Sequence, residues 1–336
     1  MIENENYIDY LNKTIFPPKE FNFTAIDLFA GCGGLSLGFE SAGIKTIGYE
    51  RMLDCCTTYK RNLHSDCNQV NITPETEFPN AQIVIGGPPC QPFSRRGKQT
   101  GKEDERNGFP AFISAIRRIN PRIWMCENVK GLPEQNEDYY KTILSEMRSL
   151  GYIVESKVFQ LVNYDIPQNR ERLVIVGHHG GFKFPESSNR KITAGEALGE
   201  LAFQIPDDAI FLTPEQDIYI AKYEKASKCK NPRDLQLDRP ARTLTCRNLA
   251  GATSDMHRIK LPDGRRRRIS VREAARLQGF PDWFEFSGTE TKKFYQIGNA
   301  VPPLLAYKIA LQVKATYHME QQTTDYIRNR IIPNSL

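Results

Sequence analysis

The chain has 336 residues, and its 45 Lys and Arg against 40 Asp and Glu give a formal net charge of +5. With 40% hydrophobic and 25% charged residues, the composition is that of a globular protein and excludes a disordered chain, a fibre or a coiled coil. No apolar run reaches the ~18 residues of a membrane span, and the acidic start lacks the apolar stretch of a signal peptide, so we expect a cytosolic protein.

Strands and helices alternate over the first 180 residues. Short apolar runs predict the strands, and apolar residues at helical spacing predict the helices between them. The expected strands are 23–29, 44–49, 81–85, 122–126, 152–161 and 172–176, and the expected helices are 35–42, 109–119 and 139–150. This alternation is typical of an α/β fold, and we predict a doubly wound, mostly parallel sheet.

The pattern changes after about residue 180. Residues 181–264 are richer in Pro, Lys and Arg and hold few long periodic segments, which predicts a second, smaller domain of irregular or β character. A helix is expected over 271–278, because Ser270 and Glu273 have the spacing of a capping box. A last helix, over about 303–318, is expected to belong to the first domain again.

A glycine-rich loop, 30–34, joins the first expected strand to the first expected helix. Glycines suit a tight turn that approaches a ligand, and a helix N-terminus offers free N–H groups. Glu50 ends the next strand, where a carboxylate can accept hydrogen bonds from ribose hydroxyls. Ser36 stands where a dinucleotide fingerprint has its third glycine, so the loop indicates a nucleoside cofactor and argues against NAD. The alternative is a packing turn without a ligand.

Cys90 follows the strand 81–85 on a stiff Pro88-Pro89 arm. Ligands of α/β sheets gather at the carboxyl ends of strands, and the two prolines restrict the backbone. Both features suit a nucleophile whose position must be reproducible. None of the five histidines pairs recognisably with Cys90, which argues against papain-like hydrolysis. The eight cysteines show no CxxC or zinc spacing, so we expect free thiols, no metal site, and a core position for Cys126.

Further polar groups come near the ends of the predicted strands. Glu127 follows the strand 122–126, where partial desolvation can let a carboxyl hold a proton near neutral pH. Arg170 and Arg172 are alternate residues, and arginine can neutralise a phosphate or fork to a carbonyl. The basic runs 95–102 and 265–268 suit a phosphate backbone. The alternatives are that Glu127 is a surface carboxylate, that Arg170 and Arg172 form salt bridges, and that the two basic runs are solvated loops.

Taken together and in order, six segments of the chain resemble the bacterial DNA cytosine-5 methyltransferases of restriction–modification systems. They are DLFAGCGGLSLGFE (27–40), GGPPCQPFS (86–94), ENV (127–129), QNRER (168–172), RISVREAARLQGFP (268–281) and QIGNAVPP (296–303). The resemblance spans nearly the whole chain. It implies a Rossmann-like fold that uses S-adenosyl-methionine as methyl donor and releases S-adenosyl-homocysteine.

The resemblance also implies a catalytic mechanism. Cys90 would add to C6 of a flipped-out cytosine, so that C5 becomes nucleophilic enough to take the methyl group. Glu127 would donate a proton or hydrogen bond to N3, Arg172 would hold O2, and Arg170 would contact a neighbouring phosphate or the adduct. The base that removes the C5 proton is not readable from the sequence.

The cofactor and DNA contacts follow from the same resemblance. Arg51 stands where the family often has an aromatic residue, and Asn71 where it usually has an acid. The implied cofactor contacts are Phe29, Gly31, Gly33, Gly34, Leu35, Glu50, Arg51, Asn71, Ile72, Pro88, Phe109, Asn299 and Val301. The implied DNA contacts are Gln91, Ser94, Arg96, Lys98, Arg242, Thr243, Thr245, Arg267 and Arg268.

The resemblance divides the chain by role. Residues 1–180 are expected to form the catalytic and cofactor-binding domain, 181–290 the target-recognition domain, and 291–336 a segment that completes the catalytic domain. The expected partner is double-stranded DNA. We expect a monomer in the bacterial cytoplasm, associated with the nucleoid and away from membranes, with a cognate restriction endonuclease encoded nearby but not in physical contact.

Other functions remain to be separated from this one. A tRNA cytosine-5 methyltransferase would share the fold and the cysteine, but it usually carries a Cys-Phe-Thr element, to which Thr245-Cys246-Arg247 is the nearest segment here. A non-catalytic DNA-binding regulator of this fold should have degraded motifs. A nicotinamide enzyme is disfavoured by Ser36 and by a cysteine without a histidine partner. The recognition sequence cannot be read from the chain.

Overall fold

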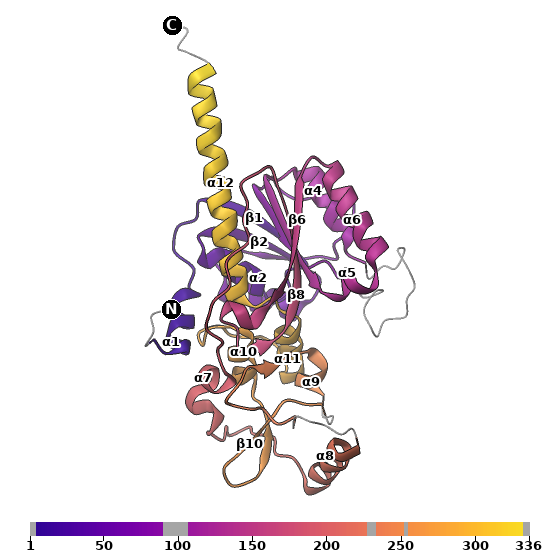
Figure 1. The fold of residues 1–336 in the computed structure, drawn as a ribbon, viewed down its shortest axis with the longest axis vertical. Coiled ribbons are helices and arrows are strands. Elements are labelled where there is room, and N and C mark those ends of the chain that lie inside the picture. The colour runs from indigo at the N-terminus through magenta and orange to yellow at the C-terminus, as the bar shows by residue number, and fades with distance from the viewer. Residues whose placement is uncertain (1–4, 90–106, 227–232, 252–254, 332–336) are drawn as a thin grey trace. The chain divides into compact units, whose positions relative to one another are not determined.

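The computed structural model describes residues 5–89, 107–226, 233–251 and 255–331, with side chains up to 319 (Figure 1). These residues form two compact units. Unit 1 comprises Met1–Phe16, Gln160–Arg170 and Ser187–Leu304, and unit 2 comprises Pro17–Phe159, Glu171–Glu186 and Leu305–Leu336. The chain therefore passes between the units five times, at 16/17, 159/160, 170/171, 186/187 and 304/305. Compactness does not assign roles, so the predicted division by function stays a prediction.

Unit 2 is built on a seven-stranded sheet in the order β3-β2-β1-β4-β5-β8-β6. The pairings β1–β2, β1–β4, β2–β3 and β4–β5 are parallel, whereas β5–β8 is antiparallel. The mostly parallel α/β sheet confirms the predicted fold class. The strands are β1 (Phe23–Leu28), β2 (Ile44–Glu50), β3 (Cys67–Gln69), β4 (Ile83–Gly86), β5 (Ile123–Val129), β6 (Ile153–Gln160) and β8 (Glu171–His178).

Helices cover both faces of this sheet. The amphipathic helices α4 and α6 pack on one face through a cluster that includes Phe112, Ile143 and Met147 together with Val84 and Trp124 of the strands. In Figure 1 these two helices lie on the side of the sheet opposite α12. The helices are α2 (Gly34–Ser41), α3 (Leu53–Asn62), α4 (Phe109–Ile119), α5 (Gly131–Gln135), α6 (Glu137–Ser149) and α12 (Pro303–Ile331).

Unit 1 contains short elements. β10 and β11 form an antiparallel hairpin, and β7 and β9 form a short parallel pair. Helix α10 starts with the predicted capping box: Glu273 N–H donates to Ser270 Oγ over 3.2 Å, and Ser270 N–H donates to Glu273 Oε2 over 2.6 Å. The elements are α1 (Tyr7–Thr14), β7 (Gln168–Asn169), α7 (Ala194–Leu198), α8 (Pro214–Ala226), β9 (Ala241–Arg242), α9 (Cys246–Ala250), β10 (Arg258–Lys260), β11 (Arg266–Arg268), α10 (Val271–Gln278) and α11 (Glu290–Asn299), with 3-10 turns at Leu161–Tyr164 and Gly199–Ala202.

Two helices of unit 1 leave little trace in the sequence pattern. Helix α8 buries only Ile220, so it has no apolar stripe for periodicity to reveal. Helix α1 buries only Tyr7 and Leu11, and its sequence reads as a polar lead-in. Within the described ranges, no helix has the length and hydropathy that crossing a bilayer requires.

Candidate active site

The loop after β1 has an open backbone beside a helix N-terminus. Phe29 and Gly31 have positive φ angles of 61° and 56°, a region that costs a non-glycine residue roughly 1–2 kcal/mol. A Cβ atom added to Gly31 would meet nothing within 4 Å, whereas one added to Gly33 would lie 2.8 Å from Leu63 Cδ1. Gly33 also caps α2. The open side at Gly31 fits the predicted nucleoside cofactor, and the crowding at Gly33 gives that glycine a packing reason.

Glu50 is fixed at the end of β2 by the loop itself. Its Oε2 accepts from Gly31 N–H over 3.0 Å, and its Oε1 accepts from Met52 N–H over 2.8 Å. The side chain remains partly exposed. The carboxylate is therefore pre-oriented next to the open backbone, as a ribose-binding acid must be.

A buried polar group lies under this loop. Asp27 is fully buried, and Ser36 Oγ donates to its Oδ2 over 2.6 Å. Tyr59 donates to Ser36 Oγ over 2.9 Å. Burial raises the pKa of Asp27 to about 7, and the charge of Glu50 acts in the same direction. Ser36, which replaces the third glycine of a dinucleotide fingerprint, therefore serves as the hydrogen-bond donor to this carboxyl.

The other predicted cofactor residues differ in access. Arg51 and Asn71 are exposed, and Ile72 is partly buried. Gly34, Leu35 and Pro88 are buried. Phe109 is completely buried against Tyr139, with ring centroids 6.2 Å apart in an edge-to-face arrangement. The predicted cofactor contact of Phe109 is therefore corrected: its ring belongs to the core.

The carboxyl end of β5 carries the charged pair of the site. Glu127 Oε1 lies 2.7 Å from Arg172 Nε, and both side chains are largely buried, at 13% and 16% exposure. In the antiparallel pairing of β5 with β8, Val129 lies opposite Arg172. This register brings the side chains of Glu127 and Arg172 together. Burial lowers the pKa of the Arg172 guanidinium, and the charge of Glu127 raises it. The structure thus joins two of the four predicted catalytic residues.

The Pro-Pro arm ends beside this pair. Asn128 Nδ2 donates to Pro88 O over 2.9 Å, and Gly108 N–H donates to Pro89 O over 2.8 Å. On the other side, Asn107 Nδ2 donates to Tyr139 Oη over 2.5 Å. Both chain segments that flank 90–106 are thus held by hydrogen bonds. The predicted nucleophile Cys90 and the predicted DNA contacts Gln91, Ser94, Arg96 and Lys98 lie outside the described residues.

Gln168 and Arg170 hold a backbone segment of unit 1. Arg170 is 2% exposed and donates to the carbonyl oxygens of Leu244 (2.6 Å), Gly298 (3.1 Å) and Ala300 (3.4 Å). Gln168 is fully buried and accepts from Leu244 N–H over 3.1 Å. Both the N–H and the C=O of Leu244 are therefore hydrogen-bonded. We call Gln168 and Arg170 together the clamp. The predicted phosphate or adduct contact of Arg170 is corrected to a positioning role, because its guanidinium is buried among carbonyl oxygens.

The predicted DNA and cofactor contacts of unit 1 lie around this clamp. Thr243 Oγ1 donates to Asn169 O, and Thr245 is exposed at the cap of α9. Asn299 is exposed, and its Oδ1 accepts from the Cys246 thiol over 3.0 Å. Val301 is buried.

The predicted arginine contacts to DNA are not equally available. Arg267 is fully buried and paired with the equally buried Glu273, with Nη2 2.7 Å from Oε1. Its predicted phosphate contact is corrected, because a guanidinium enclosed in a buried ion pair cannot reach a ligand. Arg268 donates to Leu249 O over 2.9 Å, and Arg242 donates to Asp255 Oδ1 over 3.0 Å. For Arg242 and Arg268 a phosphate contact stays a prediction, and it would compete with these internal bonds.

Three residues of the site have roles that the sequence alone did not indicate. They are the Asn128 side chain that holds Pro88, the Gln168 side chain that holds Leu244, and the Ser36 hydroxyl on Asp27. Each lies within one of the six motif segments. Their partners are backbone atoms or residues at a distance in the chain, and only the fold reveals these.

Comparisons with known proteins identify the family of the chain. Residues 23–315 match the profile of the family described as C-5 cytosine-specific DNA methylase. The type II methyltransferase M.AplI of Arthrospira platensis is 50% identical over 327 residues, covering 96% of this chain and 95% of the relative. The type II methyltransferase M.Eco47II of Escherichia coli is 32% identical over 334 residues, covering 87% and 78%. The solved structure of the Entamoeba histolytica methyltransferase EhMeth, 16% identical, has a TM-score of 0.67 and covers 90% of this chain and 99% of that one.

These matches confirm the resemblance seen in the motifs. The structural likeness, at 16% identity, supports the fold alone. The profile match covers most of the chain, and a relative is 50% identical over nearly its full length. The chain belongs to the family of C-5 cytosine-specific DNA methylases.

Proposed function

We propose that the chain transfers a methyl group from S-adenosyl-methionine to C5 of cytosine in a specific double-stranded DNA sequence, as the modification enzyme of a restriction–modification system. Family membership supports the reaction, and the type II methyltransferases among the relatives support the biological setting. The observation that carries the proposal is the Glu127–Arg172 pair, 2.7 Å apart beside the Pro88-Pro89 arm. A Glu–Arg pair beside the Pro-Pro arm that precedes Cys90 in the sequence suits attack on a pyrimidine.

The residues after β1 and β2 fit the cofactor. Gly31 offers open backbone, and Glu50 is oriented by two N–H groups beside it. S-adenosyl-methionine would supply an electrophilic methyl group here and leave as S-adenosyl-homocysteine. Glu50 would bind the ribose, and Phe29, Gly31, Gly33, Gly34, Leu35, Arg51, Asn71, Ile72, Pro88, Asn299 and Val301 would line the rest of the pocket.

The catalytic residues would act on a cytosine that has left the DNA stack. The Cys90 thiolate forms a bond to C6, and the displaced ring electrons make C5 nucleophilic. Glu127 donates a proton or hydrogen bond to N3, while Arg172 holds O2 and keeps the Glu127 carboxyl oriented. After methylation, loss of the C5 proton expels the thiolate and restores the aromatic ring. Gln91, Ser94, Arg96, Lys98, Thr243 and Thr245 would contact the DNA.

The decisive experiment is radiolabel transfer from S-adenosyl-methionine with plasmid DNA and with tRNA as acceptors. We expect methylated DNA, and we expect Cys90→Ser to abolish transfer while DNA binding survives. Cys126→Ser is the matched control, because Cys126 lies fully buried in β5, where it cannot act as a nucleophile. Label found only in tRNA, or full activity of Cys90→Ser, would refute the proposal.

The remaining expectations belong to the same proposal. They are a monomer in the cytoplasm, associated with the nucleoid, and a cognate endonuclease that makes no physical contact. Bisulfite sequencing of plasmid DNA methylated by the protein would identify the recognition sequence.

A further inference from the structure

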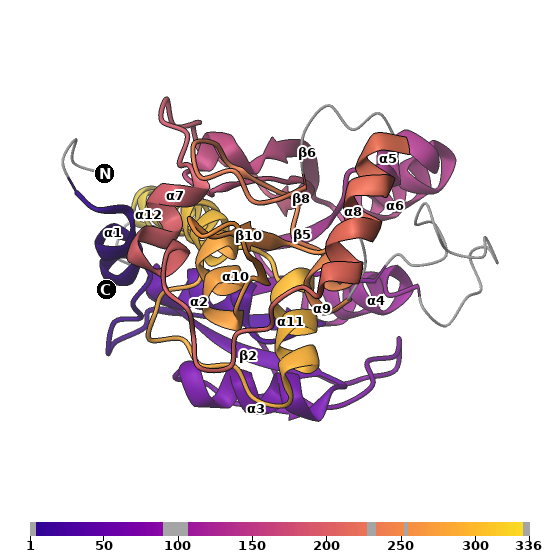
Figure 2. The ribbon, with the colours of Figure 1, turned by 90° about the horizontal axis from the view of Figure 1, so that it is seen from below.

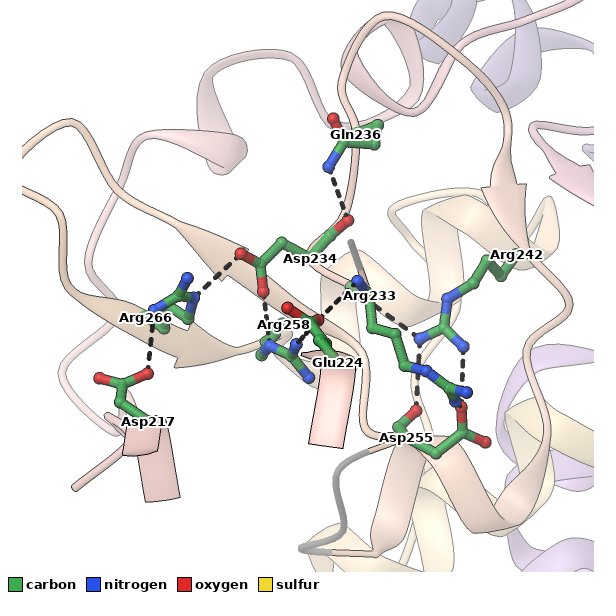
Figure 3. Close-up of polar contacts among 9 residues, drawn as sticks. All are labelled: Asp217, Glu224, Arg233, Asp234, Gln236, Arg242, Asp255, Arg258 and Arg266. Carbon is green, nitrogen blue, oxygen red and sulfur yellow. Dashed lines mark hydrogen bonds and ion pairs between the residues drawn. The ribbon is translucent and has the colours of Figure 1, made fainter. Parts of the chain in front are cut away.

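The arginines of the recognition region (181–290) are mostly engaged with acids of the same region. Figure 3 shows Arg258 between Asp234 and Glu224, with Nε–Oδ1 and Nη2–Oε1 distances of 2.5 Å and 3.0 Å. Arg266 bridges Asp234 and Asp217 over 2.9 Å and 3.0 Å. Four arginines and four acids take part in these contacts, so their charges cancel: Arg233, Arg242, Arg258 and Arg266 with Asp217, Glu224, Asp234 and Asp255.

The other arginines of unit 1 are engaged in similar ways. Exposed Arg190, Arg239 and Arg265 pair with neighbouring acids, and Arg276 pairs with Asp282. Arg272 donates to two carbonyl oxygens. A guanidinium that is already paired gains less from a phosphate, because the existing ion pair must be given up.

Arg247 is different. It is exposed, and in the described part of unit 1 it is the arginine whose side chain has no hydrogen bond, ion pair or ring contact. Its position on α9 puts it two residues after Thr245, which is also exposed. An unpaired guanidinium is available to an incoming anion without breaking an internal contact.

The helix that carries Arg247 is held by hydrogen bonds to the segment before it and to Arg268. Asn248 Nδ2 donates to Thr243 O over 2.9 Å, and its Oδ1 accepts from Thr245 N–H over 2.7 Å. Arg268 Nη2 donates to Leu249 O over 2.9 Å. These bonds fix the backbone of α9 before any ligand arrives, which lowers the cost of ordering a contact.

The location of α9 indicates which part of a DNA substrate it meets. Figure 2 shows α9 beside α11, and a Cβ atom added to Gly298 of α11 would lie only 2.5 Å from Cys246 N. The Cys246 thiol donates to Asn299 Oδ1 over 3.0 Å, and burial raises the pKa of this thiol, so it keeps its proton. Asn299 is among the residues proposed to line the cofactor pocket, and Thr243 and Thr245, which precede α9, are proposed to contact the DNA.

We propose that Arg247 binds a backbone phosphate next to the flipped cytosine. The inference rests on the proposed function and adds a DNA contact that the motifs did not indicate. It also distinguishes two arginines that flank residues 243–245: Arg242 must give up its pair with Asp255 to reach a phosphate, and Arg247 gives up no such contact. Arginine is suited to this task because its fork geometry matches a phosphate.

The test measures how binding depends on salt. The ligand is a labelled duplex that carries the sequence identified by bisulfite sequencing, and the full chain is used with S-adenosyl-homocysteine. Each phosphate contact contributes about 0.9 to the slope of log Kd against log salt. We expect Arg247→Gln to lower the slope by that amount, so that between 50 and 200 mM salt it loses about 3-fold less affinity than the parent. Arg247→Lys should retain most of the slope.

Arg239→Gln is the matched control, because Arg239 is also exposed in unit 1 but is paired with Asp238. It should keep the parent slope, and both variants should unfold at the parent temperature. An equal slope in the parent and Arg247→Gln, an equal change in both variants, or a relaxed sequence preference at constant slope would overturn the phosphate assignment. Methyl transfer to plasmid DNA by the parent is scored separately, so failure of the proposed function is distinguishable from failure of this inference.

Discussion

The carboxyl ends of the strands in unit 2 (the sheet edge) and the proposed recognition region (181–290) use polar residues in opposite ways. At the sheet edge, Glu50 and Glu127 are held by one or two bonds each and keep part of their surface exposed. In the recognition region, arginines such as Arg258 and Arg267 are fully buried and paired with acids. The first arrangement leaves groups available to a substrate, and the second adds buried ion pairs to an apolar core that includes Leu244, Ile259 and Phe280. The difference shows why counting basic residues overestimates the DNA-binding surface.

The largest effect is expected at the sheet edge. Glu127→Gln should lower kcat about 10²- to 10⁴-fold, because it removes the group proposed to donate to N3 and leaves Arg172 without its partner. Initial rates of methyl transfer with saturating DNA measure this change. Glu134→Gln, at an exposed ion pair with Lys130, is the control and should keep the parent kcat. If Glu127→Gln retains a kcat within roughly 2-fold of the parent, as an unrelated surface variant would, then Glu127 has no part in the mechanism.

The buried pair of unit 1 should affect stability instead of chemistry. Arg267→Met leaves the Glu273 carboxylate buried without a charged partner, which costs about 3–5 kcal/mol of unfolding free energy. Urea unfolding measures it. The double variant Arg267→Met/Glu273→Leu should recover only part of the loss, because no charge is then left buried but the bond from Ser270 N–H to Glu273 is lost. If the single variant is as stable as the parent, then Arg267 is not enclosed in this pair, and its predicted phosphate contact regains support.

The pH dependence of stability isolates Asp27. Its folded pKa of about 7 lies above the unfolded value of 3.8, so the folded protein binds a proton that the unfolded chain has released. The associated stability is complete below about pH 4 and is lost as the pH rises through about 7, with roughly 4 kcal/mol as an upper bound. Asp27→Asn should therefore flatten the decline of the urea midpoint between about pH 4 and pH 7. Exposed Asp66→Asn is the control, and parallel pH profiles for the parent and Asp27→Asn would contradict the raised pKa.

The smallest effect compares one glycine from each unit. Gly31 and Gly264 both have positive φ, at 56° and 90° respectively, and an added Cβ atom would meet open space at either position. An alanine at either position should cost about 1 kcal/mol of stability. Only Gly31→Ala should also weaken S-adenosyl-homocysteine binding, on the order of 10-fold by calorimetry, because the alanine methyl group would occupy the open space beside the Gly31 backbone. Equal cofactor affinity in the two variants would move the cofactor away from Gly31.

The sequence predicted unit 2 better than unit 1 for a physical reason. The strands of a parallel sheet are continuous apolar runs, and α4 is strongly amphipathic. The buried positions of these elements can therefore be read from the spacing of apolar residues in the sequence. The capping box at Ser270 was also readable, because both of its partners lie within one turn. The recognition region is held by ion pairs between residues such as Asp217 and Arg266, far apart in the chain, and no periodicity reports them.

In the site too, local motifs could be read from the sequence, whereas contacts between distant residues could not. Glu127 and Arg172 were identified from motifs, and only the antiparallel pairing of β5 and β8 explains why they meet. Arg170 and Arg267 were assigned to ligands because arginine is the residue of phosphate sites. Arg170 donates to carbonyl oxygens of residues far along the chain, and Arg267 pairs with the buried Glu273, so burial determined the roles of both arginines.

The clamp formed by Gln168 and Arg170 affects which side chains of the protein can be substituted during evolution. It grips Leu244, Gly298 and Ala300 through main-chain N–H and C=O groups, which every non-proline residue possesses. Side chains elsewhere in the recognition region can then be replaced without loosening this attachment. A main-chain anchor of this kind would let the proposed target-recognition residues change while the bonds to Leu244, Gly298 and Ala300 stay the same.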